Sequence, residues 1–142
     1  MKQLALGLLA LWVASASASD CPIVYLRGGE LSKFDHIAHQ VMDGRYHIVD
    51  IDPVAHAFVD PKALSGSMPS APADTDGQPL HGYVLLAYVI TSTGQVESPR
   101  LVKSTDTRLT ALALAATETW RLAPGEADGK AVCVVAIQEF NF

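Results

Sequence analysis

The sequence predicts an α+β fold in which a helix packs on a small, mainly antiparallel sheet. Residues 83–90 are apolar at every position, which is typical of a strand covered on both faces. A turn at residues 92–94 and a second extended run follow at once, as in a β-hairpin. Apolar residues then recur at helical spacing, and an alternating run closes the chain.

The first 18 residues have the composition of an export signal. One basic residue, Lys2, precedes an apolar run of about ten residues, and small residues at A-x-A spacing follow. This run is about half as long as the roughly 20 residues that a membrane-spanning helix needs. We therefore expect cleavage after Ala18, export to the periplasm, and no membrane span in the mature chain.

The charge of the chain excludes two classes of partner. Asp and Glu number 15 against 10 Lys and Arg, which gives a formal net charge of -5. Nucleic acids and anionic membrane surfaces both favour clustered Lys and Arg, and no such cluster occurs. We expect neither as a partner.

Two cysteines, Cys21 and Cys133, stand near opposite ends of the mature chain. An even number of cysteines in an exported protein favours a disulfide. Closing so long a loop would stabilise the fold by about 4–5 kcal/mol in the chain-entropy model. The alternative is two unpaired thiols, with Cys133 packed in a strand.

Residues 19–64 are predicted to form an N-terminal segment of strand, helix and strand. Residues 22–26 are a short apolar run, and apolar positions from Phe34 to Met42 repeat at i, i+3, i+4 and i+7, which predicts an amphipathic helix. Residues 46–52 alternate and predict a strand that Pro53 stops. Residues 54–59 are compatible with a strand or a short helix. Residues 65–81 are rich in Pro, Gly and Ser and are predicted to be a linker.

Residues 82–142 are predicted to be the main domain. After the first strand and turn, residues 96–103 form the returning strand, and Pro99 places it at an edge or marks a bulge, because proline lacks a ladder donor. Asp106 or a neighbouring threonine caps the following helix. Leu109, Leu112, Ala113, Ala116 and Trp120 form its sheet-facing side, Pro124-Gly125 ends it, and Asp128-Gly129 turns the chain into the last strand, 131–142.

The same region carries an ordered series of short motifs. The series is Gly82-x-Val84-x-Leu86-x-Tyr88-x-Ile90, Gly94-x-Val96, Leu101-Val102-Lys103-Ser104-Thr105, the helical Leu109, Ala113 and Ala116, Trp120-Arg121-Leu122-Ala123-Pro124, Asp128-Gly129-Lys130-Ala131-Val132 and Phe140-x-Phe142. In this order the motifs resemble the C-terminal domain of TonB-type energy transducers. The resemblance covers less than half of the chain.

This resemblance implies a periplasmic module of Gram-negative bacteria whose sheet edge accepts an extended peptide from an outer-membrane transporter. Main-chain hydrogen bonds would supply the affinity and alternating pockets the selectivity. By position, the last strand is the expected docking edge. The expected contact residues are Val132, Val134, Ala136, Gln138 and Phe140, while Trp120, Arg121 and Pro124 are expected to be structural.

The chain also departs from the family pattern. Energy transducers carry a membrane anchor and a long Pro-rich spacer, and this sequence shows only the signal, so we expect that it does not transduce energy by itself. The family's Tyr-Pro pair, about ten residues before the position of Gly82, is Ala71-Pro72 here.

The leading hypothesis is therefore a soluble periplasmic binding or adaptor module without cofactor or catalysis. No G-x-S-x-G, H-E-x-x-H or phosphate-binding glycine loop occurs. The first alternative is a metal-binding envelope protein, because His36 and His39 lie at i, i+3 on the predicted N-terminal helix. The second is a structural domain that self-associates, as a homodimer, through its own exposed edge.

Overall fold

The structure is a computed structural model that describes residues 21–27, 42 and 45–142. The predicted signal (1–18) and most of the predicted helix that ends at Met42 lie outside these residues. The elements are β1 (Ile23–Arg27), β2 (His47–Ile51), β3 (Lys62–Ser65), β4 (Tyr83–Ile90), β5 (Val96–Ser104), α2 (Thr107–Glu118), β6 (Arg121–Ala123), β7 (Gly125–Ala127) and β8 (Lys130–Asn141).

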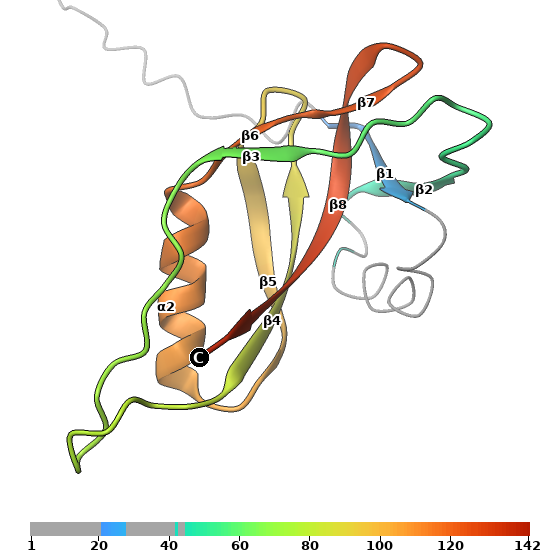
Figure 1. Cartoon of the computed structure of the whole chain (residues 1–142). Coiled ribbons are helices and arrows are strands. Elements are labelled where there is room, and N and C mark those ends of the chain that lie inside the picture. Colours follow the sequence, from blue (N-terminus) through green and yellow to red (C-terminus); the bar gives the residue numbers. More distant parts are fainter. Residues whose placement is uncertain (1–20, 28–41, 43–44) are drawn as a thin grey trace, which may run out of the picture.

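The main sheet has six strands, with the order β2-β1-β8-β4-β5, and β7 pairs additionally with β8. β4 is antiparallel to both of its neighbours, β5 and β8, whereas β1 is parallel to β2 and to β8. β3 and β6 form a separate two-stranded sheet near the end of α2 (Figure 1). The fold is α+β, a mixed sheet with a helix packed on it, as the sequence predicts.

β4 is apolar on both faces because both faces are covered. On one face Leu86 is completely buried together with Leu109 of α2. On the other face Ala87 and Val89 are buried with Val24 of β1. Fully burying a side chain of the size of leucine stabilises a fold by about 1.5–3 kcal/mol, so each layer contributes substantially.

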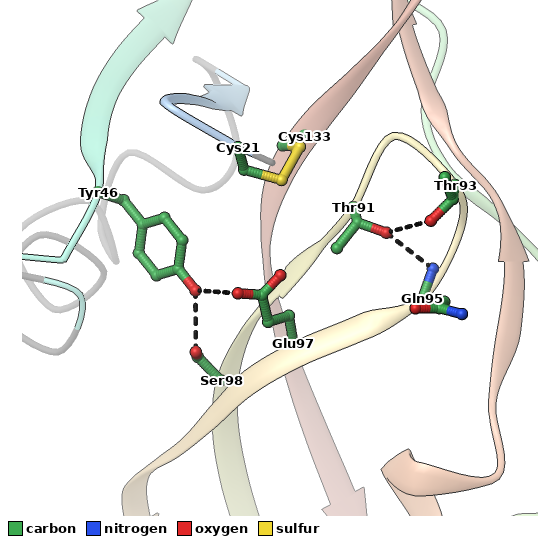
Figure 2. Close-up of a disulfide and its surroundings, with 8 residues drawn as sticks. All are labelled: Cys21, Tyr46, Thr91, Thr93, Gln95, Glu97, Ser98 and Cys133. Atoms are coloured by element: carbon green, nitrogen blue, oxygen red, sulfur yellow. Dashed lines mark hydrogen bonds between the residues drawn. A yellow bond between two sulfur atoms is a disulfide. The ribbon is translucent and has the colours of Figure 1, made fainter. Parts of the chain in front are cut away.

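The described part of the N-terminal segment adds β1 and β2 to the sheet, and its buried residues Val24, Leu26 and Met42 pack with Ala87 and Val89 on the face opposite α2. A disulfide between Cys21 and Cys133 connects the residue just before β1 to β8, with a Cα–Cα distance of 5.8 Å (Figure 2). The Tyr46 hydroxyl donates to the Glu97 carboxylate at 3.0 Å and pairs with the Ser98 hydroxyl at 2.8 Å. The predicted disulfide is confirmed, and these contacts fix the segment to two strands of the sheet.

The turn between β4 and β5 requires glycine at its last position. Gly94 has a φ of 82°, and a Cβ atom at this position would overlap the carbonyl group of Leu122. The Leu122 amide donates to the Gly94 carbonyl at 2.9 Å. The glycine therefore permits both the turn and the close approach of β6.

β5 is an edge strand with interrupted pairing. Its register against β4 shifts twice, and Ser98, which precedes Pro99, has a φ of 50°. The prediction from Pro99 is confirmed, since the strand is both at the edge and bulged.

α2 ends earlier than the sequence predicts. Its last residue is Glu118, and Thr119 is the C-cap, with its amide bonded to the Ala116 carbonyl. Trp120 lies beyond the helix, and the residues that follow it pair with β3 as β6. The prediction that the helix continues to Pro124 is wrong, because β-pairing with a distant segment takes over after the cap. Residues 54–59 likewise form turns and an isolated bridge rather than a strand or helix.

Asp106 is the N-cap of α2, and its carboxylate accepts the Arg108 amide at 2.8 Å. The Arg108 guanidinium also donates to this carboxylate at 2.7 Å, which holds the pKa of Asp106 below its ordinary value of 3.8. A lowered carboxyl pKa stabilises the fold above the ordinary value, and this stability is lost as the pH falls through the lowered pKa.

We therefore expect Asp106→Ala to lower the free energy of unfolding at neutral pH, and to have a smaller effect in strong acid. Urea unfolding of both proteins from pH 7 downward measures this difference, with Asp106→Asn as a control that keeps a capping oxygen. A difference that stays constant down to pH 2 would contradict the assignment.

Candidate functional site: the open edge of β8 and the adjoining groove

β8 is paired on one side along most of its length and on the other side only near its start. β7 pairs with residues 130–132 and β4 with residues 134–141. On the side away from β4, β1 pairs with Cys133 and Val134. No strand of the described residues pairs with that side from residue 136 to 141. The prediction that the last strand lies at the edge is thus wrong for its first part, where β1 and β7 cover it, and fits only the remainder.

The register shows which main-chain groups face the open side. Gly82 and Phe142 exchange two hydrogen bonds, of 2.9 and 3.3 Å, and the pairing of β4 with β8 then runs without a shift. In an antiparallel pair such bonded positions alternate along each strand. Even-numbered residues of β8 therefore bond to β4, and Ile137, Glu139 and Asn141 direct their N–H and C=O groups to the open side.

Because even-numbered residues bond to β4, the five residues predicted as contacts do not direct their main-chain groups to the open side. Val132 pairs with β7, Val134 is buried, and the Phe140 side chain is only 1% exposed in the core cluster that includes α2 residues. Val134, Ala136 and Gln138 line the groove described below, and of these three only Ala136 and Gln138 lie beside the open edge. Alternating hydrophobicity reports side-chain faces but not which residues bond to which neighbour, so it did not point to the odd-numbered positions.

The Gln138 side chain lies across part of this edge. Its amide donates to the Glu139 carbonyl at 2.8 Å and so occupies one outward acceptor. A docking strand would have to break this hydrogen bond before it could pair with the Glu139 carbonyl. The main-chain N–H groups of Ile137 and Glu139 are not involved in this bond.

Among the edges of the described sheet, β8 offers the most regular template. β5 is interrupted by two register shifts and by Pro99, and such features hinder the addition of a strand. β2, at the opposite end of the sheet, has only five residues. The open part of β8 has neither a bulge nor a proline.

A strap, residues 59–68, crosses near this edge and includes β3 (Figure 1). At one end Val59 and Glu126 exchange main-chain hydrogen bonds of 2.8 and 2.9 Å. At the other end β3 pairs with β6, and the Trp120 indole N–H donates to the Ser67 carbonyl at 2.9 Å. The strap is thus held at both ends.

A groove of about 1050 Å³ lies between the strap and the sheet. The strap contributes residues 60, 61 and 63–68, and β8 contributes residues 134–138. The remaining apolar lining includes Tyr88, Ile90, Trp120 and Leu122. Burial raises the pKa of the Tyr88 hydroxyl to about 12, so this group is neutral at physiological pH. The groove meets the open edge of β8 at residues 136–138.

The three residues expected to be structural surround the exit from α2. The Trp120 ring contacts Tyr88 edge-on, with centroids 6.1 Å apart, and lies 5.5 Å from the ring of Phe140. Arg121 donates from Nη1 to the Trp120 carbonyl at 2.7 Å. Pro124 separates β6 from β7.

The two histidines of the metal hypothesis, His36 and His39, lie outside the residues that the structure describes. Within residues 21–27, 42 and 45–142, no three His, Cys, Asp or Glu side chains are arranged so that they could hold a metal ion. In the same part of the chain, no helix has the length and apolar character needed to span a bilayer.

Comparison with known proteins decides the family. Residues 69–142, just over half of the chain, match the family described as Gram-negative bacterial TonB protein C-terminal. The chain belongs to the TonB C-terminal family. The match begins inside the segment predicted as a linker, so this TonB C-terminal domain includes residues that pass alongside α2 before β4 (Figure 1).

The chain is also similar to a solved structure, the solution NMR structure of the Pseudomonas aeruginosa TonB CTD. The sequence identity is 26% and the TM-score is 0.47. The similarity covers 58% of this chain and 85% of that one. No curated protein sequence matches the chain.

Proposed function

We propose that this protein is a periplasmic binding module that accepts an extended protein segment along the open edge of β8. The observation that carries the proposal is the set of outward main-chain groups at Ile137, Glu139 and Asn141, which no described strand pairs. Addition of a strand to such an edge satisfies these groups and gives affinity with little dependence on side chains. The module would bind its partner without catalysis.

Family membership suggests the class of partner. The resemblance of residues 82–142 to TonB-type transducers implies an extended segment of an outer-membrane transporter. The N-terminal segment narrows the site, because β1 and the disulfide at Cys133 cover the start of β8. The docked strand would therefore pair with residues 136–141.

A proline substitution tests the edge directly. Glu139 is exposed and its N–H faces the open side, so Glu139→Pro removes one donor and places a ring where the docking strand would lie. We expect the affinity for the peptide to fall by about tenfold or more, because at least one main-chain hydrogen bond is lost and the proline ring clashes with the docked strand. Glu139→Ala, which keeps the N–H, should bind like the wild type.

Titration calorimetry with 12-residue peptides from transporter N-terminal segments of the same organism measures this effect. Circular dichroism checks that both variants fold. Equal affinity of the Pro and Ala variants would contradict the proposal. Sedimentation at several concentrations identifies the competing occupant, a second copy of the chain, whose pairing the Pro variant would also abolish.

A further inference from the structure

The hydroxyl of Tyr88 is a buried polar group that has no hydrogen-bond partner among the described residues. Tyr88 is only 4% exposed and belongs to the core cluster that includes Leu109 and Phe140. Buried polar groups in proteins nearly always have a partner, and leaving one without costs about 1–3 kcal/mol. Because Tyr88 lines the groove, a ligand in the groove could supply the missing bond.

The strap side of the groove exposes apolar surface. Leu64 and Met68 are 67% and 63% exposed, and both line the groove. Methionine adapts readily to the shape of an apolar ligand. Ala136 of β8 and Trp120 also line the groove. The groove thus combines apolar residues with the buried hydroxyl of Tyr88, and its other polar lining residues are Asp60, Ser65, Ser67 and Gln138.

The position of the groove determines what can enter it from a docked strand. Successive side chains of a strand point to opposite faces of the sheet. In a strand added beside β8, every second side chain lies on the face of Ala136 and Gln138, where the groove opens. The intervening side chains lie on the opposite face, where Val24, Leu26 and Met42 pack with Val135.

We propose that the groove is a selectivity pocket for a tyrosine side chain of the docked segment. The inference rests on the proposed function, because the tyrosine is delivered by a strand paired with β8. Its ring packs against Trp120 and the apolar side chains of the strap, and its hydroxyl pairs with that of Tyr88. The strap is held at both ends, so the pocket exists before the segment binds.

The test compares three peptides that differ only at one position facing the groove, where they carry Tyr, Phe or Ala. NMR titration of the isotope-labelled protein locates the binding and gives the affinity. We expect the Tyr peptide to bind about fivefold more tightly than the Phe peptide, the value of one net hydrogen bond. The Ala peptide should be weakest, and the Trp120 indole N–H should shift with the Tyr peptide.

Two variants assign the difference to the proposed contact. Tyr88→Phe should make the Tyr and Phe peptides bind equally. Tyr83→Phe is the matched control on the same strand, because Tyr83 does not line the groove. Its ring lies beside Lys103 instead, with 5.7 Å between the ring centroid and the Lys103 Nζ. This control should leave the fivefold preference unchanged.

The failures of the two proposals are distinguishable. If all three peptides shift the amides of residues 137–141 and bind equally to the wild type, docking stands and the pocket is overturned. If no peptide shifts those amides at millimolar concentration, docking itself fails, and the pocket proposal fails with it. A preference for Tyr that survives in Tyr88→Phe also overturns the assigned hydroxyl pair.

Discussion

Replacing both cysteines by alanine (C21A/C133A) is expected to lower the free energy of unfolding by about 4–5 kcal/mol. The disulfide joins residues that are 112 positions apart, so its loss restores a large conformational freedom to the unfolded chain. Both cysteines are buried, at 3% and 5% exposure, and their removal also loosens packing between β1 and β8. The free energy of unfolding of a typical domain is only about 5–15 kcal/mol, so this loss is a large fraction of it.

Urea unfolding followed by circular dichroism measures this change in the double variant and in the oxidised wild type. The reduced wild type is the matched control, since it loses the bond but keeps both sulfur atoms, and it should account for most of the effect. A change below about 1 kcal/mol would show that the unfolded chain gains little freedom, contrary to the chain-entropy argument.

Trp120→Ala is expected to lower the free energy of unfolding by about 3–5 kcal/mol, the usual cost of removing a packed tryptophan. The ring contacts Tyr88 and Phe140 and its N–H holds the strap at Ser67. Removing it therefore opens the core between α2 and the sheet and releases one end of the strap.

Trp120→Phe separates these two roles. Phenylalanine keeps an aromatic ring in the core but cannot donate to the Ser67 carbonyl, so we expect a smaller loss, which includes about 1 kcal/mol for the hydrogen bond. Thermal unfolding of both variants gives the comparison. Equal losses in the two variants would mean that the ring packing contributes little and that the strap contact dominates.

Features encoded by nearby residues could be predicted from the sequence. The two-sided burial of β4 follows from its unbroken apolar run, the turn from Gly94, and the bulged edge from Pro99. The disulfide followed from the count of cysteines and the export signal. The strand, the turn and the bulge each depend on residues that are close together in the chain. The disulfide depends on there being only two cysteines, which leaves one possible pair.

Features that depend on pairing between distant segments could not be predicted. The helical spacing continues to Trp120, but β6 pairs with β3 some sixty residues earlier, and this pairing ends α2 at Glu118. The open edge of β8 depends on β1 covering one part of it and on the parity of its bonds to β4. Neither fact is present in the pattern of β8 alone, so the outward residues became visible only in the structure.

The most direct test of the account is to observe intermolecular NOEs in the complex with a transporter-derived peptide. Docking on β8 predicts contacts between peptide backbone protons and those of Ile137, Glu139 and Asn141, with slowed amide exchange at the same residues. Contacts confined to β5, the other long edge strand, would contradict the account, because the segment would then bind to the bulged edge and not to β8.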